Sequence, residues 1–364
     1  MKKNILSILL TITFFWAYSQ DIDTTLTIEE IQFRDSIATI NSKNALIQQI
    51  QESYNAGTEA FTSSNFKEAI TFFESVIALD SANSDAYFNK GLSHKELKNY
   101  EIAISDFKTT FMIDDSNFDA ILNIAKCYEF LNNIEQALSI YDSLLYLNPN
   151  HAEAAYNQGV LYYLQKDYDN AIKAYSKAIK INPSYAYALN DRGSCYRALE
   201  EYNNAAADYL EASKNDPQAF IFNNLASTYR KSGNKDKAID FYNKAIKLDA
   251  NYEMAYNNRG TVYFESEEYD KALKDFKKAI EINSDYAMAL CNRAAIYHLQ
   301  EHYTGALADL EQAVKLQPNN ATALLNRGIT REMLRDVDGA CQDWQKSYQL
   351  GMEKANEYYI NNCE

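Results

Sequence analysis

The sequence predicts an all-α fold, a solenoid built from a row of helical hairpins. The first observation is an alanine that returns every 34 residues, with one interval of 33, namely Ala69, Ala103, Ala137, Ala171, Ala205, Ala238, Ala272, Ala306 and Ala340. The second is that a glycine or alanine stands twelve residues before each of them, and a bulky apolar residue four residues after. The third is that all four prolines lie twelve residues after one of these alanines, where a helix should end. Self-similarity at one fixed period indicates stacked repeats.

Each period is expected to form two helices. In the period 152–185, apolar residues recur at helical spacing over 154–163 and again over 171–179, with the polar turn 165–167 between them. Gly159 and Ala171 are small because two antiparallel helices approach closely only where neither carries a bulky side chain. Tyr175 and its equivalents are expected to fill the space between neighbouring hairpins.

The motif of this period resembles the consensus of the tetratricopeptide repeat family. It reads Tyr-Asn-x-Gly-x-x-Tyr-Tyr, then Asp-Tyr-x-x-Ala-Ile-x-x-Tyr, and it ends in Asn-Pro. The resemblance covers residues 50–354 as nine repeats, at 50–83, 84–117, 118–151, 152–185, 186–218, 219–252, 253–286, 287–320 and 321–354. It implies a right-handed α-α superhelix whose concave groove binds peptides or proteins. The terminal repeats depart from the motif, as expected where their outer faces meet water.

The first 49 residues have a different character. Residues 1–19 resemble a secretory signal peptide, with Lys2 and Lys3, an apolar run over 5–16 and small residues before Gln20. The run is shorter than the ~20 residues that span a bilayer, which disfavours the alternative of an uncleaved anchor. Residues 20–49 are expected to form a spacer and a helix that leads into, or caps, the first repeat, with an apolar stripe of Ile28, Ile31, Ile37, Ile40, Leu46 and Ile50.

The acidic composition limits the class of partner. The formal net charge is -15, whereas nucleic acids and anionic membrane surfaces reward clustered lysine and arginine. The sequence therefore predicts a protein or peptide partner and no nucleic acid. After signal cleavage we expect no membrane span, and a location in the periplasm of a Gram-negative cell or outside the cell.

One pair of positions predicts salt bridges within single repeats. A basic residue directly before the recurrent small residue occurs together with an aspartate sixteen residues later, or neither occurs. The pairs are Lys90 with Asp106, Arg192 with Asp208, Arg259 with Asp275, Arg293 with Asp309, and Arg327 with Asp343. The other repeats lack both charges, as in Leu225 with Phe241. We therefore interpret these arginines as structural and not as ligand-binding.

The family resemblance places the first helix of each repeat on the groove, where positions 2, 5, 9 and 12 of a repeat should face a ligand. Repeats 5 and 6 present Tyr187, Asn190, Ser194, Arg197, Phe220, Asn223, Ser227 and Arg230 there. Two arginines at equivalent positions of adjacent repeats are suited to an acidic or C-terminal peptide. The alternative is that they are solvated surface charges. Tyr156 and Tyr163 form a second, aromatic candidate.

One motif suggests catalysis. The residues His298, Glu301 and His302 match H-x-x-E-H, which occurs in zinc hydrolases. That chemistry requires both histidines on one helix, whereas the repeat register places His298 at the end of a first helix and the other two in a turn. We expect no metal and no cofactor, since no glycine-rich phosphate loop or Ser/His/Asp arrangement is recognisable.

The five cysteines separate into two kinds. Cys127 and Cys195 are expected to be small core residues. Gly351 is expected to end the last repeat, and the residues after it to fold back as a C-terminal capping helix, assigned to 355–364. That hairpin would bring Cys341 and Cys363 close together, either as a disulfide or as free thiols.

Taken together, the sequence predicts an exported, non-enzymatic adaptor that binds a segment of a partner protein in a groove. A structural or self-associating envelope scaffold is the alternative, and a zinc hydrolase is the remote one.

Overall fold

The computed structural model describes residues 28–363, and every regular element in this range is an α-helix. The predicted signal peptide over 1–19 lies outside the described residues. The structure divides into two compact units, one up to Asn133 and the other from Ile134 onward. This boundary falls inside the third predicted repeat, between its two helices.

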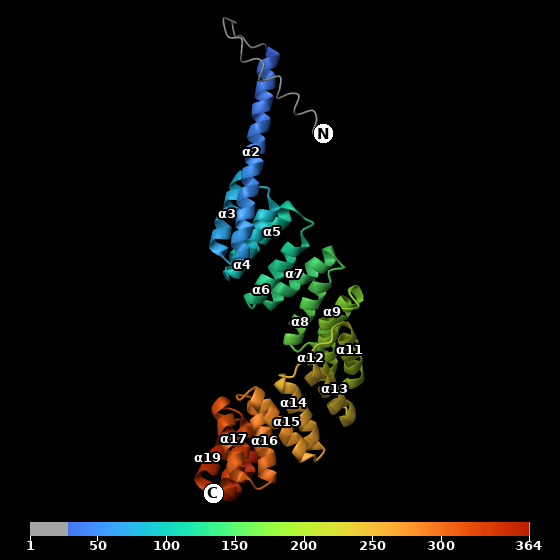
Figure 1. Cartoon of the computed structure of the whole chain (residues 1–364), viewed down its shortest axis with the longest axis vertical. Coiled ribbons are helices and arrows are strands. Elements are labelled where there is room, and N and C mark those ends of the chain that lie inside the picture. Colours follow the sequence, from blue (N-terminus) through green and yellow to red (C-terminus); the bar gives the residue numbers. More distant parts are fainter. Residues whose placement is uncertain (1–27, 364) are drawn as a thin grey trace. The chain divides into compact units, whose positions relative to one another are not determined.

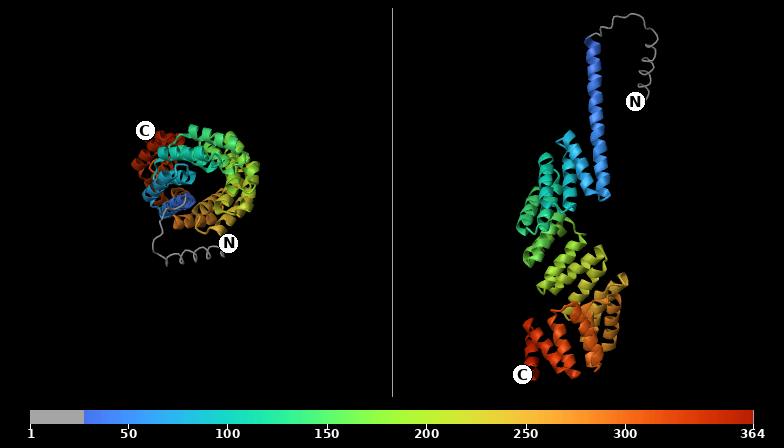
Figure 2. Two further views of the ribbon diagram at one scale, coloured as in Figure 1. Left: turned by 90° about the horizontal axis from the view of Figure 1, so that it is seen from above. Right: turned by 90° about the vertical axis from the view of Figure 1, so that its left-hand side faces the viewer.

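The first unit contains two complete hairpins and one further helix. Its helices are α2 (Ile28–Thr62), α3 (Phe66–Leu79), α4 (Ser84–Glu96), α5 (Tyr100–Ile113) and α6 (Phe118–Phe130). The lead-in helix and the first helix of repeat 1 form one continuous helix, α2, which extends far beyond α3 to α5 (Figures 1 and 2). Residues 28–49 are exposed, including Ile28 and Ile40 of the predicted stripe. This segment therefore leads into repeat 1 and does not cap it.

The second unit begins with α7 and continues as six hairpins and a terminal helix. Its helices are α7 (Ile134–Leu147), α8 (Ala152–Leu164), α9 (Tyr168–Ile181), α10 (Ala186–Ala198), α11 (Tyr202–Asn215), α12 (Ala219–Lys231), α13 (Lys235–Leu248), α14 (Glu253–Glu265), α15 (Tyr269–Ile282), α16 (Ala287–Leu299), α17 (Tyr303–Leu316), α18 (Ala321–Met333), α19 (Val337–Gln349) and α20 (Glu353–Cys363). From α8 to α18, each first helix of this unit packs against the second helix of its own repeat and of the preceding one.

The two helices of a hairpin approach closely where a ring lies over a small residue. A Cβ atom added to Gly159 would lie 2.6 Å from the Tyr175 ring, and one added to Gly328 would lie 2.5 Å from the Trp344 ring. The rings themselves are fully buried, as are the recurrent alanines. The small residues are therefore needed for close approach.

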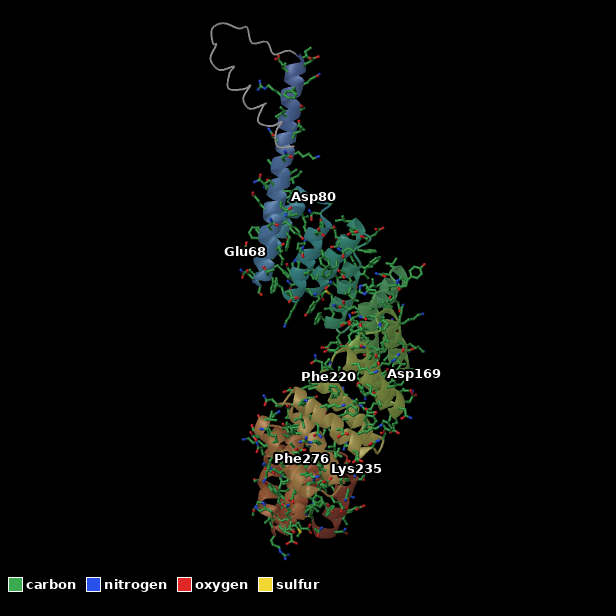
Figure 3. The ribbon with its side chains drawn as sticks, turned by 45° about the vertical axis from the view of Figure 1, so that its right-hand side comes forward. Glu68, Asp80, Asp169, Phe220, Lys235 and Phe276 are labelled. Carbon is green, nitrogen blue, oxygen red and sulfur yellow. A yellow bond between two sulfur atoms is a disulfide. The ribbon has the colours of Figure 1, made fainter. Side chains whose placement is uncertain are left out.

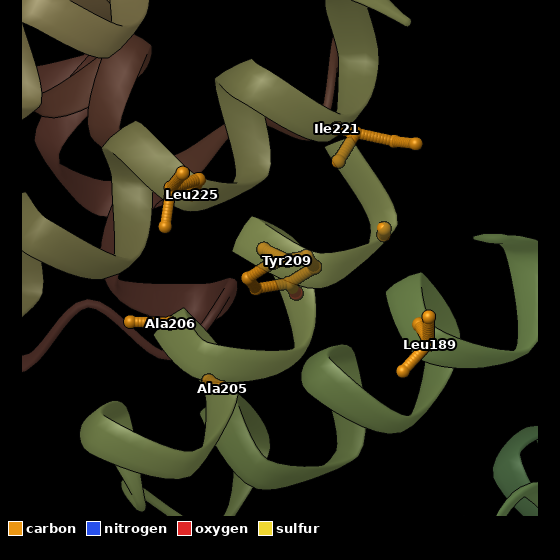
Figure 4. Packing of buried hydrophobic residues seen from close by; sticks show 7 residues of the cluster. Leu189, Ala205, Ala206, Tyr209, Ile221 and Leu225 are labelled. Atoms are coloured by element: carbon orange, nitrogen blue, oxygen red, sulfur yellow. The ribbon is translucent and has the colours of Figure 1, made fainter. Parts of the chain in front are cut away.

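The same rings also join neighbouring hairpins. Tyr209 of α11 belongs to a buried cluster with Leu189 of α10 and with Ile221 and Leu225 of α12 (Figure 4). One bulky residue thus contacts its own first helix and the next one, so that each hairpin buries apolar surface against its neighbour.

The five ion pairs predicted from the sequence are all present. Each arginine holds its aspartate with two hydrogen bonds, as in Arg259 Nε to Asp275 Oδ2 and Nη2 to Oδ1, both 2.7 Å. Asp275 is 4% exposed, so the pair is largely removed from water. The Lys90–Asp106 pair differs because lysine makes a single contact of 3.0 Å and leaves Asp106 Oδ2 without a hydrogen bond. Burial raises the pKa of Asp106.

A disulfide joins Cys341 of α19 to Cys363 of α20, with 5.8 Å between the Cα atoms. Gly351 takes a left-handed conformation, with φ at 92°, where the chain turns between these helices. The capping helix begins at Glu353, two residues before the predicted start. Cys127, Cys195 and Cys291 are free, and burial raises the pKa of their thiols to about 11, 12 and 11.

We predict that Arg259→Leu destabilises the protein by about 3–5 kcal/mol, because it leaves a buried carboxylate unpaired. The double variant Arg259→Leu/Asp275→Phe, which copies the Leu225 and Phe241 of repeat 6, should recover most of this loss. Urea denaturation followed by circular dichroism measures both. Equal destabilisation in the single and double variants would contradict a buried ion pair.

We also predict that alkylation distinguishes the two kinds of cysteine. At pH 8 the three free thiols should react slowly with iodoacetamide in the native protein, because the nucleophile is the thiolate and burial disfavours it. In denaturant without reductant, mass spectrometry should count three modified cysteines, and five after reduction. Five modified cysteines before reduction would rule out the disulfide in the purified protein.

Candidate functional site

Five of the predicted groove residues line one cavity in the second unit. It has a volume of 410 Å³, and its lining includes Tyr163 of α8, Ser194 and Arg197 of α10, and Ser227 and Arg230 of α12. Lys231, Glu200 and Tyr202 complete its polar border. We call this site the cationic cavity because three of its lining residues are basic and one is acidic. The serines and arginines occupy positions 9 and 12 of repeats 5 and 6, as the register predicts.

Arg197 is held in the cavity by aromatic packing and lacks a charged partner. Its guanidinium carbon lies 5.9 Å from the centre of the Tyr209 ring, and no ion pair or hydrogen bond of its side chain occurs within residues 28–363. The Tyr209 hydroxyl is 2.9 Å from the Ser194 hydroxyl, at the wall of the same cavity. Burial raises the pKa of Tyr163, against the opposing effect of Arg197. Arg197 is therefore a preorganised cation whose hydrogen-bond donors are free.

Arg230 is partly committed to a neighbouring acid. Its Nη1 donates to Glu265 Oε1 at 2.8 Å, and Glu265 lies at the end of α14 in the next repeat. The Nε atom of Arg230 is buried and has no hydrogen-bond partner in the described chain. A buried donor without a hydrogen bond destabilises the folded state by about 1–3 kcal/mol. Arg230 is therefore only partly satisfied by its contact with Glu265.

Asn190 and Asn223 do not face a ligand, which corrects the prediction for position 5. They are 6% and 3% exposed and accept hydrogen bonds from the next repeat. Asn224 donates to Asn190 at 3.1 Å and Asn258 donates to Asn223 at 3.0 Å. Position 6 of one repeat thus bonds to position 5 of the preceding one. Buried amides require such partners, so these side chains join adjacent first helices.

The aromatic candidates have separate roles. Tyr156 is also at position 5, and its hydroxyl donates to Asp191 at 2.8 Å. Burial raises the pKa of both groups. Tyr187 is 49% exposed and stacks on Phe220, with ring centres 6.1 Å apart. Phe220 lies at the start of α12 (Figure 3). Tyr187 and Phe220 do not line the cationic cavity.

The H-x-x-E-H motif does not form a metal site in the described residues. His298 lies on α16, whereas His302 is the residue before α17, so the two histidines are on different elements. His298 packs against Tyr303, and His302 packs against Tyr297. Over 28–363, no group of three His, Cys, Asp or Glu residues is placed to hold a metal ion.

The turn residues of the cavity were missed at the sequence level. Glu200 lies between α10 and α11 with a φ of 62°, and Tyr202 is the first residue of α11. The equivalent turn position has a positive φ in all nine repeats, and its side chain varies. Its conformation is thus set by the hairpin, and the sequence gives no signal that this turn borders a cavity.

Stacked helical hairpins with a fixed period define an α-helical repeat protein. Models described as tetratricopeptide repeat match residues 54–109, 95–158, 152–185, 186–218, 219–252, 254–286 and 287–320. The chain belongs to the tetratricopeptide repeat family. A search of curated proteins found no match.

Two solved structures share the fold. The crystal structure of the APC/C hetero-tetramer Cut9–Hcn1 is similar at a TM-score of 0.55 and 15% identity, over 86% of this chain and 76% of that chain. A structure described under the functional characterisation of Pseudomonas aeruginosa pilF is similar at 0.52 and 20% identity, over 58% of this chain and 97% of that one. At these identities the likeness shows the fold alone. Among the described helices, none is both long and apolar enough to cross a membrane.

Proposed function

We propose that this protein is a non-enzymatic adaptor that binds an acidic segment of a partner protein in the cationic cavity. The observation that carries the proposal is Arg197, a partly buried arginine with free donors at the wall of a polar cavity. The family membership supports protein binding as the general class of function.

The electrostatics favour a carboxylate as the group that is bound. The chain has a net charge of -15, yet Arg197, Arg230 and Lys231 meet at one cavity. A carboxylate can accept two hydrogen bonds from one guanidinium, and such charge-assisted bonds are stronger than neutral ones. The free donors of Arg197 therefore suit an aspartate, a glutamate or a chain terminus, with Arg230 and Lys231 adding positive charge beside it.

Arg197→Met should weaken binding of an acidic peptide at least tenfold, because it removes the free cation and retains much of the apolar stem. The control Lys247→Met removes an exposed charge of α13 outside the cavity and should leave affinity unchanged. Fluorescence anisotropy with a labelled Asp/Glu-rich peptide, prepared as free acid and as C-terminal amide, separates side-chain from terminal recognition. Equal affinity of Arg197→Met and wild type would exclude the cationic cavity as the site.

We further propose that the protein is exported. The signal-like residues 1–19 motivate this, and the Cys341–Cys363 disulfide supports it because disulfides persist in oxidising compartments. We predict that expression in a Gram-negative host yields a periplasmic protein whose N-terminal residue is Gln20. Osmotic-shock fractionation and N-terminal sequencing test this, and an intact Met1 in the cytoplasmic fraction would contradict it.

A further inference from the structure

A second cavity lies at the C-terminal end of the second unit and has an apolar lining. Its volume is 310 Å³, and four helices and the cap contribute to it. The residues that matter here are Phe264 of α14, Ala295 and His298 of α16, Asn326 and Ile329 of α18, and Tyr358 of α20. We call it the apolar cavity. An engineered cavity of ~150 Å³ holds benzene, so this volume accommodates an indole or phenyl ring with its stem.

The two cavities use the same repeat positions. Positions 9 and 12 carry Ser194 and Arg197 in repeat 5, and they carry Ala295 and His298 in repeat 8. Position 12 of repeat 7 is Phe264, and position 9 of repeat 9 is Ile329. Where they line a cavity, these positions are thus cationic in repeats 5 and 6 and mainly apolar in repeats 7 to 9. The remaining two positions of repeats 7 to 9, Thr261 and Glu332, lie outside the lining. A change of chemistry along one face is suited to a segment with two different anchors.

Asn326 is one of the polar residues of the apolar cavity, with His298 and Thr330, and the row of amide hydrogen bonds between repeats stops at it. Asn224, Asn258 and Asn292 each donate to an asparagine of the preceding repeat, the last one to Asn257 at 2.9 Å. Asn326 is equivalent to them, but position 5 of the preceding repeat is Cys291. Within the described residues the Asn326 side chain makes no hydrogen bond. Its amide can therefore donate to and accept from a peptide group of a ligand.

The wall formed by Tyr358 depends on the cap. Tyr358 stacks on Trp344 of α19, with ring centres 5.4 Å apart. The cap helix α20 has eleven residues, and Ala355 is its only fully buried side chain among those described. A helix of this length is marginal alone in water, so its position relies on packing and on the Cys341–Cys363 disulfide.

We propose that the apolar cavity binds an aromatic side chain of the partner segment, that Asn326 hydrogen-bonds the backbone beside it, and that the disulfide keeps the cavity formed by holding Tyr358 in place. This inference rests on the proposed protein-binding function, and it adds the second anchor. The ligand is a segment with acidic residues at one end and a phenylalanine, tyrosine or tryptophan at the other. Reduction of the disulfide then weakens the aromatic anchor and leaves the acidic one intact.

The test uses two small probes and the whole protein. N-acetyl-phenylalaninamide carries one ring and two peptide groups, and N-acetyl-alaninamide is its matched control without the ring. Ligand-observed saturation-transfer NMR should detect the first and not the second. Ala295→Trp, which fills the cavity, should lower affinity for the phenylalanine probe at least tenfold. Lys315→Trp, at an exposed position of α17 outside the cavity and on a second helix, should leave it unchanged.

Two further variants test the amide and the disulfide. Asn326→Leu should weaken binding of the phenylalanine probe by about threefold to tenfold while preserving the apolar lining. Cys341→Ser/Cys363→Ser, or reduction of the wild type, should weaken it at least threefold while the acidic peptide keeps its affinity. Circular dichroism confirms that each variant is folded.

The outcomes separate this inference from the proposed function. Equal binding of the two probes, or full binding by a folded Ala295→Trp, overturns the aromatic site, whereas acidic-peptide binding that Arg197 controls would still stand. Loss of acidic-peptide binding alone overturns the cationic anchor. An unchanged affinity for the phenylalanine probe after reduction overturns the role of the disulfide.

Discussion

The packing of a large ring against a small residue of the facing helix is the constraint on which both units depend. It fixes positions 8, 20 and 24 of each repeat, because a Cβ atom at Gly159 or Gly328 would collide with the ring that covers it. The arginine–aspartate pairs are next to this contact, since Arg259 directly precedes Gly260 and Asp275 directly precedes Phe276. Because packing determines the residues at these positions, the sequence can differ between repeats mainly where side chains point away from the contact between the two helices. Positions 9 and 12 of the first helix meet that condition.

The sequence was informative wherever both partners of a contact lie in one repeat. Nine repeats form an internal alignment, so the joint presence of Arg192 with Asp208, or of Leu225 with Phe241, indicated contact without any homologue. Contacts between repeats were harder to predict. Asn190 was assigned to a groove, although its partner Asn224 is in the next repeat and the two can be recognised only by pairing position 5 with position 6 across a boundary. Five residues of the cationic cavity were predicted from their register, but the extent of that cavity and the existence of the apolar one were not, because each combines side chains of three or more first helices. The division at Asn133 has no counterpart in the period.

Charge distribution separates structural from functional basic residues. Arg192, Arg259, Arg293 and Arg327 are neutralised by buried aspartates and are fixed in position by two hydrogen bonds each. Arg230 is half-neutralised by Glu265, and Arg197 is not neutralised within the described chain. A free cation in a protein of net charge -15 experiences a favourable background potential, so leaving it unpaired costs less than it would in a neutral protein. The same background repels an acidic partner at long range. Recognition by the cationic cavity therefore depends on short hydrogen bonds more than on electrostatic steering, and should be specific in geometry.

The end of a repeat array has an energetic problem that the disulfide addresses. An internal hairpin packs against a neighbour on both sides, whereas the cap α20 packs on one side, where Ala355 and Tyr358 join a cluster with Trp344, and Ala355 is its only fully buried side chain among those described. One-sided burial offsets less of the conformational entropy that an eleven-residue helix loses than burial on both sides does. Cross-linking it to α19 removes part of that entropy from the unfolded state, so the helix is retained with few contacts. Because few contacts hold it, the cap can leave one side of Tyr358 open to the apolar cavity while the other side stacks on Trp344. A cap stabilised by burial alone would have to fill that space with its own side chains. The disulfide thus holds α20 on α19 while the cavity beside Tyr358 stays unfilled by the cap.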